Sequence, residues 1–190
     1  MRRLLDAGAD VFSERGYHAA RVDDVVKTAR TSHGTFYLYF SNKEDLFRAL
    51  ALDVAQEMAA LAAEFPRLDS PARTTNGDGV APLRAWLSDF ADLYDRTGSV
   101  VQAWTEAEIS DSEFGRMGGG LVREFVARLA AQIRPAAPDI DPLVAATAIV
   151  AMIERTNYMR ASGTLAVERN AWLDTLAAVT YASVHGAPTN

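Results

Sequence analysis

Apolar residues recur every three or four positions along most of this chain, which is the spacing of one face of an α-helix. Over residues 22–29 the apolar face is formed by Val22, Val25, Val26 and Ala29. The same spacing predicts further helices over residues 4–15, 33–39, 41–64, 80–96, 99–110, 113–134, 141–162 and 168–185. Because strand-like alternation of Val, Ile and Thr is nearly absent, the pattern predicts an all-α fold.

Residues with known capping preferences mark the ends of the first helices. Gly16 follows the last periodic residue of the first helix, where a left-handed backbone is favourable. Ser32 stands where the third helix needs an N-cap, and Ser41 with Glu44 has capping-box spacing at the start of the fourth. Residues 66–79 combine Pro and Gly with Ser, Thr and Asn, and we expect them to form a linker.

The first 40 residues contain three short predicted helices with a tight turn before the third, which is the layout of a helix-turn-helix. On the third helix, Phe36 and Phe40 lie four residues apart and are expected to face the core. Gly34 has no side chain and allows a close approach of the backbone. Hydroxyls bind phosphates, ring and methyl surfaces contact thymine methyls, and an imidazole edge bonds bases. The outer face suits a DNA major groove because it carries His33, Thr35, Tyr37 and Tyr39.

Composition restricts the classes of protein to which the chain can belong. Hydrophobic residues make up 49% and charged residues 23%, which is typical of a globular protein rather than a disordered one. The chain has no cysteine, so disulfides, thiolate metal sites and cysteine nucleophiles are excluded. No leader and no apolar run of transmembrane length is evident, and we therefore expect a soluble cytoplasmic protein without a membrane partner.

Charge is distributed unevenly along the sequence. The net charge of −6 divides into +1 for residues 1–50 and −7 for residues 51–190. DNA binding needs local positive charge facing phosphates rather than a protein that is basic as a whole. The distribution therefore fits a DNA-binding head on an acidic body.

Four blocks of sequence resemble the head of the tetracycline-repressor-type (TetR) family of transcriptional regulators. They are residues 12–17 (FSERGY), 22–25 (VDDV), 32–40 (SHGTFYLYF) and 42–46 (NKEDL). The resemblance covers residues 4–50 and implies a homodimer with two heads on a palindromic operator and a ligand cavity in each body. It divides the chain into a helix-turn-helix DNA-binding domain, residues 1–48, and a helical ligand-binding and dimerisation domain, residues 49–190.

The resemblance also assigns roles within the head. His33, Thr35 and Tyr37 match positions that face bases or the groove, whereas Tyr39 and Lys43 match positions that contact phosphates. Arg21 replaces a hydroxyl residue of the family and is long enough to reach a phosphate itself. The predicted DNA interface is therefore Arg21, Ser32, His33, Gly34, Thr35, Tyr37, Tyr39 and Lys43. The alternative is that these are ordinary solvent-exposed side chains, with Arg21 either solvated or paired with Asp24.

The turn before the third helix departs from the family pattern. The family has Gly-Val where this chain has Arg30 and Thr31. Arg30 must therefore either tolerate a strained backbone or mark a different turn.

The body contains enough bulky side chains to line an apolar ligand pocket with a few polar anchors. Glu108 and Asn157 are the candidate anchors because both stand on otherwise apolar helical stretches. The candidate pocket walls are Trp86, Phe90, Tyr94, Trp104, Met117, Phe125 and Met152. The alternative is that these apolar side chains form only the core and that the anchors are exposed.

Two amphipathic helices are predicted at the C-terminal end, over residues 141–162 and 168–185. Such a pair can join its copy in a second subunit as a four-helix bundle. The candidate dimer contacts are Ile149, Ile153, Trp172, Leu173, Leu176, Val179 and Thr180. The alternative is an intramolecular core.

These observations favour a DNA-binding transcriptional regulator, a repressor that a small apolar ligand releases from its palindromic operator. No P-loop, dinucleotide fingerprint, nucleophile elbow or Glu-x-x-His pair occurs, so an enzyme is disfavoured and no cofactor is expected. The alternative functions are a helical protein-interaction module and an activator without a small-molecule ligand.

Overall fold

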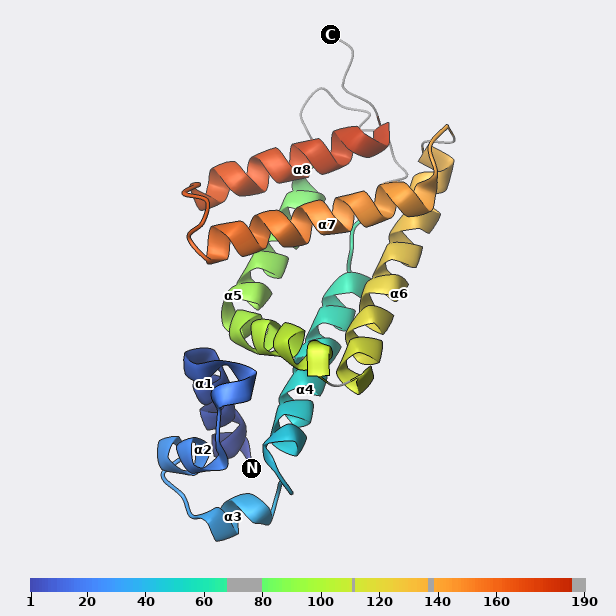
Figure 1. Ribbon diagram of the computed structural model, residues 1–190. Coiled ribbons are helices and arrows are strands. Elements are labelled where there is room, and N and C mark those ends of the chain that lie inside the picture. Colours follow the sequence, from blue (N-terminus) through green and yellow to red (C-terminus); the bar gives the residue numbers. More distant parts are fainter. Residues whose placement is uncertain (68–79, 111, 137–138, 186–190) are drawn as a thin grey trace. The chain divides into compact units, whose positions relative to one another are not determined.

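The computed structural model describes residues 1–67, 80–110, 112–136 and 139–185 of the chain. Side chains are described for these residues except 99, 102, 105–110, 112–115, 117, 118, 134–136 and 185. The described residues form helices and no strand, which confirms the predicted all-α fold (Figure 1). The helices are α1 (Arg2–Ala19), α2 (Val22–Thr28), α3 (His33–Tyr37), α4 (Lys43–Ala63), α5 (Ala81–Ser110), α6 (Ser112–Ala136), α7 (Pro142–Ala161) and α8 (Arg169–His185).

The chain separates into two compact units, each with its own core. The first unit comprises Met1–Ala59 and Arg96–Leu121, and the second comprises Ala60–Asp95 and Val122–Asn190. The first unit is therefore larger than the predicted head of residues 1–48, because it also contains part of α5 and α6. The functional division at residue 48 stays a prediction.

One predicted break between helices is absent. We expected a break between helices 80–96 and 99–110 at Gly98, whereas α5 continues through it. Glycine inside a helix costs roughly 1 kcal/mol relative to alanine. Leu93 and Val100 are buried on either side of Gly98, and their burial offsets this cost.

Aromatic side chains from three helices form the centre of the first unit. Phe12 of α1, Phe36 of α3 and Phe47 of α4 are fully buried. The rings of Phe12 and Phe47 meet edge to face with centroids 5.0 Å apart, a favourable arrangement for aromatic pairs. This packing confirms the prediction that Phe36 faces the core.

The turns of the head follow from local backbone chemistry. Gly16 has φ 73° and interrupts α1 at the predicted position, after which helical residues resume as far as Ala19. Arg30 has φ 50°, so the first of the two alternatives for this turn holds and Arg30 adopts the strained left-handed conformation.

The start of α4 differs by one residue from the predicted capping box of Ser41 and Glu44. The side-chain oxygen of Asn42 accepts a hydrogen bond from the Asp45 N–H at 2.7 Å, and the Asp45 carboxylate accepts one from the Ser41 N–H at 3.1 Å. Because α4 begins at Lys43, Asn42 is the N-cap and Asp45 takes the role that we assigned to Glu44.

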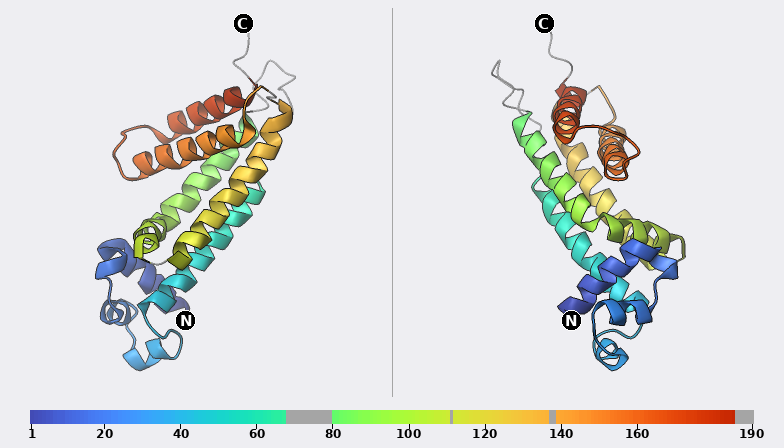
Figure 2. Two further views of the ribbon diagram at one scale, coloured as in Figure 1. Left: turned by 45° about the vertical axis from the view of Figure 1, so that its right-hand side comes forward. Right: turned by 90° about the vertical axis from the view of Figure 1, so that its left-hand side faces the viewer.

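The second unit contains α7 and α8, which lie side by side and run in opposite directions (Figures 1 and 2). Ile149 and Ile153 of α7 and Leu173 of α8 belong to one buried cluster with residues of α5 and α6. Asp141 caps α7 by accepting bonds from the Leu143 and Val144 N–H groups at 2.9 and 3.0 Å. Within the described ranges, no helix is long and apolar enough to cross a membrane.

Candidate functional site

The short helix α3 is anchored on one side by two aromatic rings. Phe36 is fully buried, and Phe40 lies beside it with a centroid distance of 5.8 Å. The predicted N-cap is confirmed, because the Ser32 hydroxyl accepts a hydrogen bond from the Thr35 N–H at 3.1 Å. The helix ends at Tyr37 rather than at residue 39, so Tyr39 lies in the turn that follows. Because these contacts bury one side of α3, its other face is left open.

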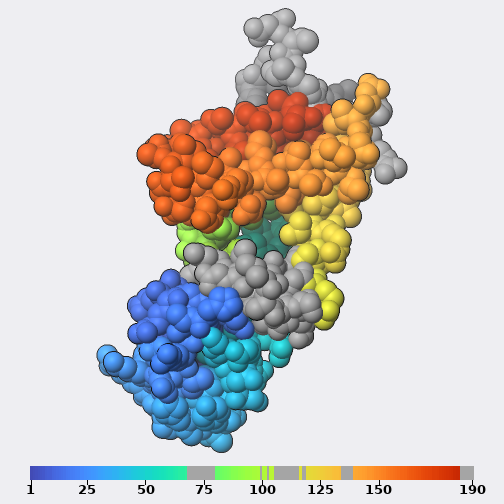
Figure 3. All heavy atoms as spheres, in the orientation of Figure 1, coloured from blue at the N-terminus to red at the C-terminus, as the bar shows by residue number. Residues whose placement is uncertain are grey.

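The open face carries large, amphipathic side chains. Tyr37 is 57% exposed, Tyr39 50% and Leu38 79%, which is unusual for residues of this size. In Figure 3 the residues from α2 to the start of α4, drawn in the lighter blues, lie at the surface of the first unit. Leu38 was not among the predicted interface residues. Its position between two exposed tyrosines was the signal that could have identified it.

His33, the first residue of α3, is hydrogen-bonded to Asp23 of α2. Its Nε2 atom lies 2.6 Å from Oδ1 of Asp23, and both side chains are exposed. Thr35, two residues further along α3, shares a 3.0 Å hydrogen bond with the Ser32 hydroxyl. Two of the predicted groove-facing residues, His33 and Thr35, therefore form local polar pairs.

Lys43 has a structural role that the sequence did not indicate. Its Nζ atom donates to the backbone carbonyls of Tyr17, His18 and Ala20 at 2.9, 3.1 and 3.2 Å, and it lies 5.0 Å from the centre of the Tyr17 ring. An ammonium group has three donors, so these bonds use all of them. The predicted phosphate contact stays a prediction, and it requires at least one of these bonds to be exchanged.

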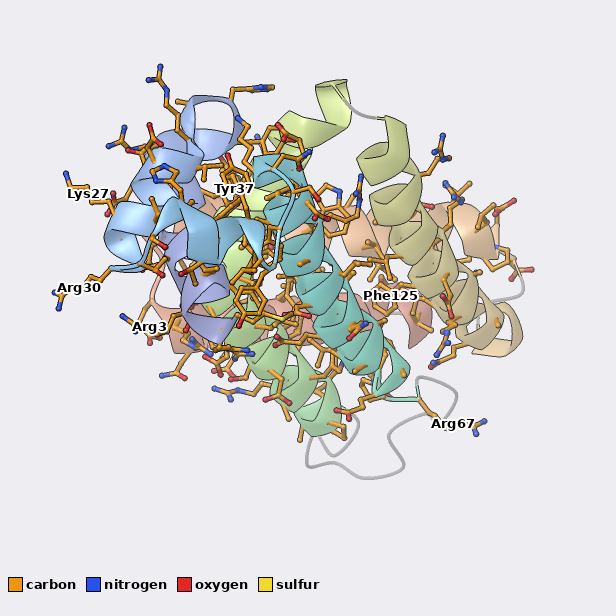
Figure 4. The ribbon with its side chains drawn as sticks, turned by 90° about the horizontal axis from the view of Figure 1, so that it is seen from below. Arg3, Lys27, Arg30, Tyr37, Arg67 and Phe125 are labelled. Carbon is orange, nitrogen blue, oxygen red and sulfur yellow. The ribbon has the colours of Figure 1, made fainter. Side chains whose placement is uncertain are left out.

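Several cationic side chains lie around α2. Arg21 precedes α2 and is exposed, and Asp24 pairs with Arg15 at 3.3 Å rather than with Arg21. The Arg3 guanidinium donates to the Ala29 carbonyl at 3.0 Å, at the C-terminal end of α2. Figure 4 shows Lys27 and Arg30 extending away from the ribbon. Positive charge is therefore present beside α3 although the chain as a whole is acidic.

Most of the predicted pocket walls gather in an aromatic cluster of the second unit. We define this aromatic cluster as Phe65, Trp86, Phe90, Tyr94 and Phe125. Trp86 is at its centre and stacks on Phe90 and Phe125 with centroid distances of 5.6 and 5.7 Å. Phe65 meets Trp86 edge to face at 4.8 Å and was missed, because it directly precedes the predicted linker.

The remaining predicted ligand residues are distributed differently. Met152 is half-buried against the core of the second unit, whereas Trp104 belongs to the core of the first unit and not to the aromatic cluster. The side chains of Glu108 and Met117 lie outside the described residues. Burial raises the pKa of Tyr94, and the negative charge of Glu154 raises it further, so the Tyr94 hydroxyl stays protonated.

Asn157 is buried, and its polar contacts are incomplete. Its side-chain oxygen accepts two bonds from Arg160, at 3.2 and 3.0 Å, while its Nδ2 donor has no hydrogen-bond partner. The Trp172 Nε1 donor is also buried without a partner, and the Arg160 guanidinium lies 5.5 Å from the Trp172 ring centre. Asp95 completes the group with a 2.7 Å bond from Arg160. The exposed alternative for Asn157 is therefore wrong.

The predicted dimer contacts need correction. Ile149, Ile153, Trp172, Leu173 and Leu176 are buried in the core of their own unit, and Thr180 is buried as well. Only Val179 of this set is exposed. The large apolar stripe of each helix packs inside the subunit, so the intramolecular alternative describes these side chains.

The chain is similar to known transcriptional regulators. Residues 4–50 match the model of the family described as bacterial regulatory proteins, tetR family. The HTH-type transcriptional regulator EthR of Mycolicibacterium smegmatis is 33% identical over 159 residues, covering 80% of this chain and 70% of that protein. The chain spans only 25–27% of the length of other curated relatives that it matches.

Solved structures extend the similarity over the whole fold. The TetR family transcriptional regulator PfmR of Thermus thermophilus has a TM-score of 0.72 at 17% identity and covers all of this chain and 98% of its own. The transcriptional regulator FadR of Bacillus subtilis, solved in complex with stearoyl-CoA, has a TM-score of 0.67 at 20% identity over 98% of both chains. Together with the EthR match, these findings show that the chain belongs to the TetR family of bacterial transcriptional regulators.

Proposed function

We propose that this DNA-binding regulator is a repressor that binds a palindromic operator as a homodimer and is released by a small apolar ligand. Members of its family are transcriptional regulators rather than enzymes. The observation that carries the proposal is the open face of α3, where Tyr37, Leu38 and Tyr39 are exposed beside His33. Their rings, hydroxyls and imidazole match the groups that a major groove offers. In this proposal residues 1–48 read DNA, and residues 49–190 bind ligand and dimerise.

The dimer proposal rests on a second face of α7 and α8. The residues of this face recur at spacings of three, four and seven, as in a helix bundle, and most are small. Small side chains allow helices of two subunits to approach closely. The face consists of Val144, Ala148, Ala151 and Tyr158 on α7 and Ala171, Thr175, Ala178 and Val179 on α8.

A charged residue in this face tests the dimer. We expect Ala178→Glu to produce monomers in light-scattering measurements, because a charge in a close helix contact lacks a partner. Ala127→Glu is the control, since Ala127 is an exposed alanine of α6. A dimeric Ala178→Glu variant would exclude this face.

The ligand proposal rests on the aromatic cluster and on the unpaired donors of the same unit. Stacked aromatic rings provide an apolar surface, and buried N–H groups without partners bind a carbonyl or carboxylate favourably. The donors in question belong to Asn157 and Trp172. The fold accommodates stearoyl-CoA in the FadR neighbour. We therefore propose an apolar chain with one hydrogen-bond acceptor as the ligand class.

The deciding experiment is selection of random duplex DNA by the purified protein, followed by sequencing. An enriched palindrome supports dimeric, sequence-specific readout. The half-sites should lie one duplex turn apart, roughly 34–36 Å, so that two recognition helices enter successive major grooves. If no sequence is enriched at low salt by folded protein, the operator proposal fails and a protein-interaction module takes its place.

Ligand release is then measured as loss of operator binding in fluorescence anisotropy. Decanoyl-CoA and methyl decanoate carry an acceptor, whereas decane does not. We expect the first two to weaken operator binding and Asn157→Leu to abolish that effect. Ala127→Leu, at an exposed position of α6, serves as the control. If decane acts as strongly as the ester, the acceptor part of the proposal is wrong.

A further inference from the structure

The hydrogen bond between His33 and Asp23 lies on the face that the proposed function assigns to DNA. His33 opens α3, Asp23 lies in the first turn of α2, and the two are joined by a 2.6 Å contact between Nε2 and Oδ1. Their side chains are 55% and 78% exposed. An exposed polar pair of this kind contributes only about 0–1 kcal/mol to stability. The contact between His33 and Asp23 therefore contributes little to the stability of the fold.

A carboxylate on this face is unfavourable for DNA binding by itself. Phosphates repel it, and the affinity of DNA-binding proteins depends on neutralising phosphate charge. In the structure Asp23 is paired with His33, and Arg15 of α1 is paired with Asp24. Asp23 at this position thus needs a role that compensates for the repulsion.

The chemistry of the pair restricts what His33 offers to a base. An ionised carboxylate only accepts hydrogen bonds, so the proton of a neutral imidazole must be on Nε2 when Nε2 faces Asp23. Nδ1 is then a bare acceptor. Without the carboxylate, the ring rotates freely and exchanges its two tautomers, and either nitrogen can present a donor or an acceptor.

We propose that Asp23 is a positioning residue that fixes the tautomer and orientation of His33, so that Nδ1 selects a base with an exocyclic amino group. In the major groove these bases are adenine, through its N6 amino group, and cytosine, through its N4 amino group. Guanine and thymine present acceptors at the corresponding edge and are rejected. Asp23 acts through His33 and does not touch the base. This inference rests on the proposed function, namely that α3 reads operator DNA.

Selection and sequencing at pH 8 compares five proteins. They are the wild type, Asp23→Ala, His33→Ala, the double variant and Asp10→Ala. Asp10 is an exposed carboxylate of α1, so Asp10→Ala is the charge-matched control. Circular dichroism melting verifies that each variant is folded, which we expect because the substituted side chains are exposed.

Asp23→Ala should reduce the preference for adenine or cytosine about five- to tenfold at one position of each half-site, the effect of one hydrogen bond. In the His33→Ala background, Asp23→Ala should leave the base preference unchanged and raise affinity for all sequences alike. Asp10→Ala should leave every base preference unchanged.

Two results overturn the inference. One is an unchanged base preference in Asp23→Ala, which makes Asp23 a surface charge like Asp10. The other is an equal loss of preference with and without His33, which shows that Asp23 does not act through the imidazole. A wild type that enriches no sequence refutes the proposed function itself, and this outcome is distinct from either of the two.

Discussion

Removing the ammonium group of Lys43 should destabilise the head rather than only weaken its contact with DNA. Lys43 stands at the first position of α4, and its Nζ atom bonds three carbonyls at the end of α1. The substitution Lys43→Met retains most of the apolar stem and removes the three donors. The carbonyls of Tyr17, His18 and Ala20 then lose their protein partner.

The size of the effect follows from these contacts. Hydrogen bonds to charged groups contribute about 1.5–3 kcal/mol each, but water replaces part of every bond at a partly exposed helix end. The position over the Tyr17 ring adds about 0.5–1 kcal/mol. We therefore expect a total loss of about 2–4 kcal/mol, which for a chain of this length lowers Tm by about 5–15 °C.

The assay combines urea denaturation, followed by circular dichroism, with operator binding at several salt concentrations. Lys27→Met is the control, because Lys27 is an exposed lysine of α2 and its removal also takes one positive charge from the head. The control should cost less than about 1 kcal/mol. A phosphate contact contributes about 0.9 to the slope of log K against log salt concentration.

Two outcomes separate the roles of Lys43. If it holds α1 to α4, Lys43→Met loses stability and changes the salt slope little. If Lys43→Met is as stable as Lys27→Met while the slope falls by about 0.9, Lys43 is a phosphate contact and our reasoning from the three carbonyls is refuted.

Substitutions at four further positions test other parts of the structure. Arg30→Gly removes the strain of a left-handed residue with φ 50° and should raise the free energy of unfolding by about 0.5–1 kcal/mol in urea denaturation. Arg30→Ala keeps the strain and should not gain this stability. Equal denaturation midpoints for the two variants would contradict this. Gly8→Val should lose about 1–3 kcal/mol, because a Cβ atom at Gly8 would lie 2.9 Å from Leu46 Cδ2; an unchanged midpoint would exclude this close packing. Gly34→Ala has room in the protein and should keep Tm while weakening operator binding, and full affinity would argue against a close backbone approach to DNA. Backbone N–H bonds from Asn170 and Ala171 lower the pKa of Glu168, so its stabilising effect is present at neutral pH and is lost as the pH falls through the lowered pKa. The Tm difference between wild type and Glu168→Gln should therefore shrink in acid, and a constant difference would disprove this origin.

Features that depend on neighbouring residues were predictable from the sequence. Gly16, Ser32 and the pair Phe36 and Phe40 were placed correctly, because capping and helical spacing act over four residues or fewer. The Asp45 cap was missed by one position, since Ser41 and Asn42 are both good N-cap residues and only the start of α4 decides between them.

Features that join distant residues were not predictable. The hydrogen bonds of Lys43 join residues that are separated by 23 to 26 positions in the sequence, and no local sequence pattern predicts them. Most of the predicted dimer contacts are core residues instead, for a related reason. Helical periodicity identifies the largest apolar stripe of a helix, and a subunit buries that stripe in its own core. Residues of the proposed dimer face, such as Ala148 and Ala178, leave little signal in a chain so rich in alanine.

Chain continuity restricts how a ligand can affect the DNA-binding head. The boundary between the two units falls within α4, α5 and α6, after Ala59, Asp95 and Leu121. A ligand in the second unit must therefore favour a conformation of these helices that differs in the first unit, because coupling equals its difference in affinity for two states. Lys43 ties the beginning of α4 to the end of α1. We infer that a displacement of α4 moves α1 with it, and that the coupling weakens when these bonds are removed even if operator binding persists.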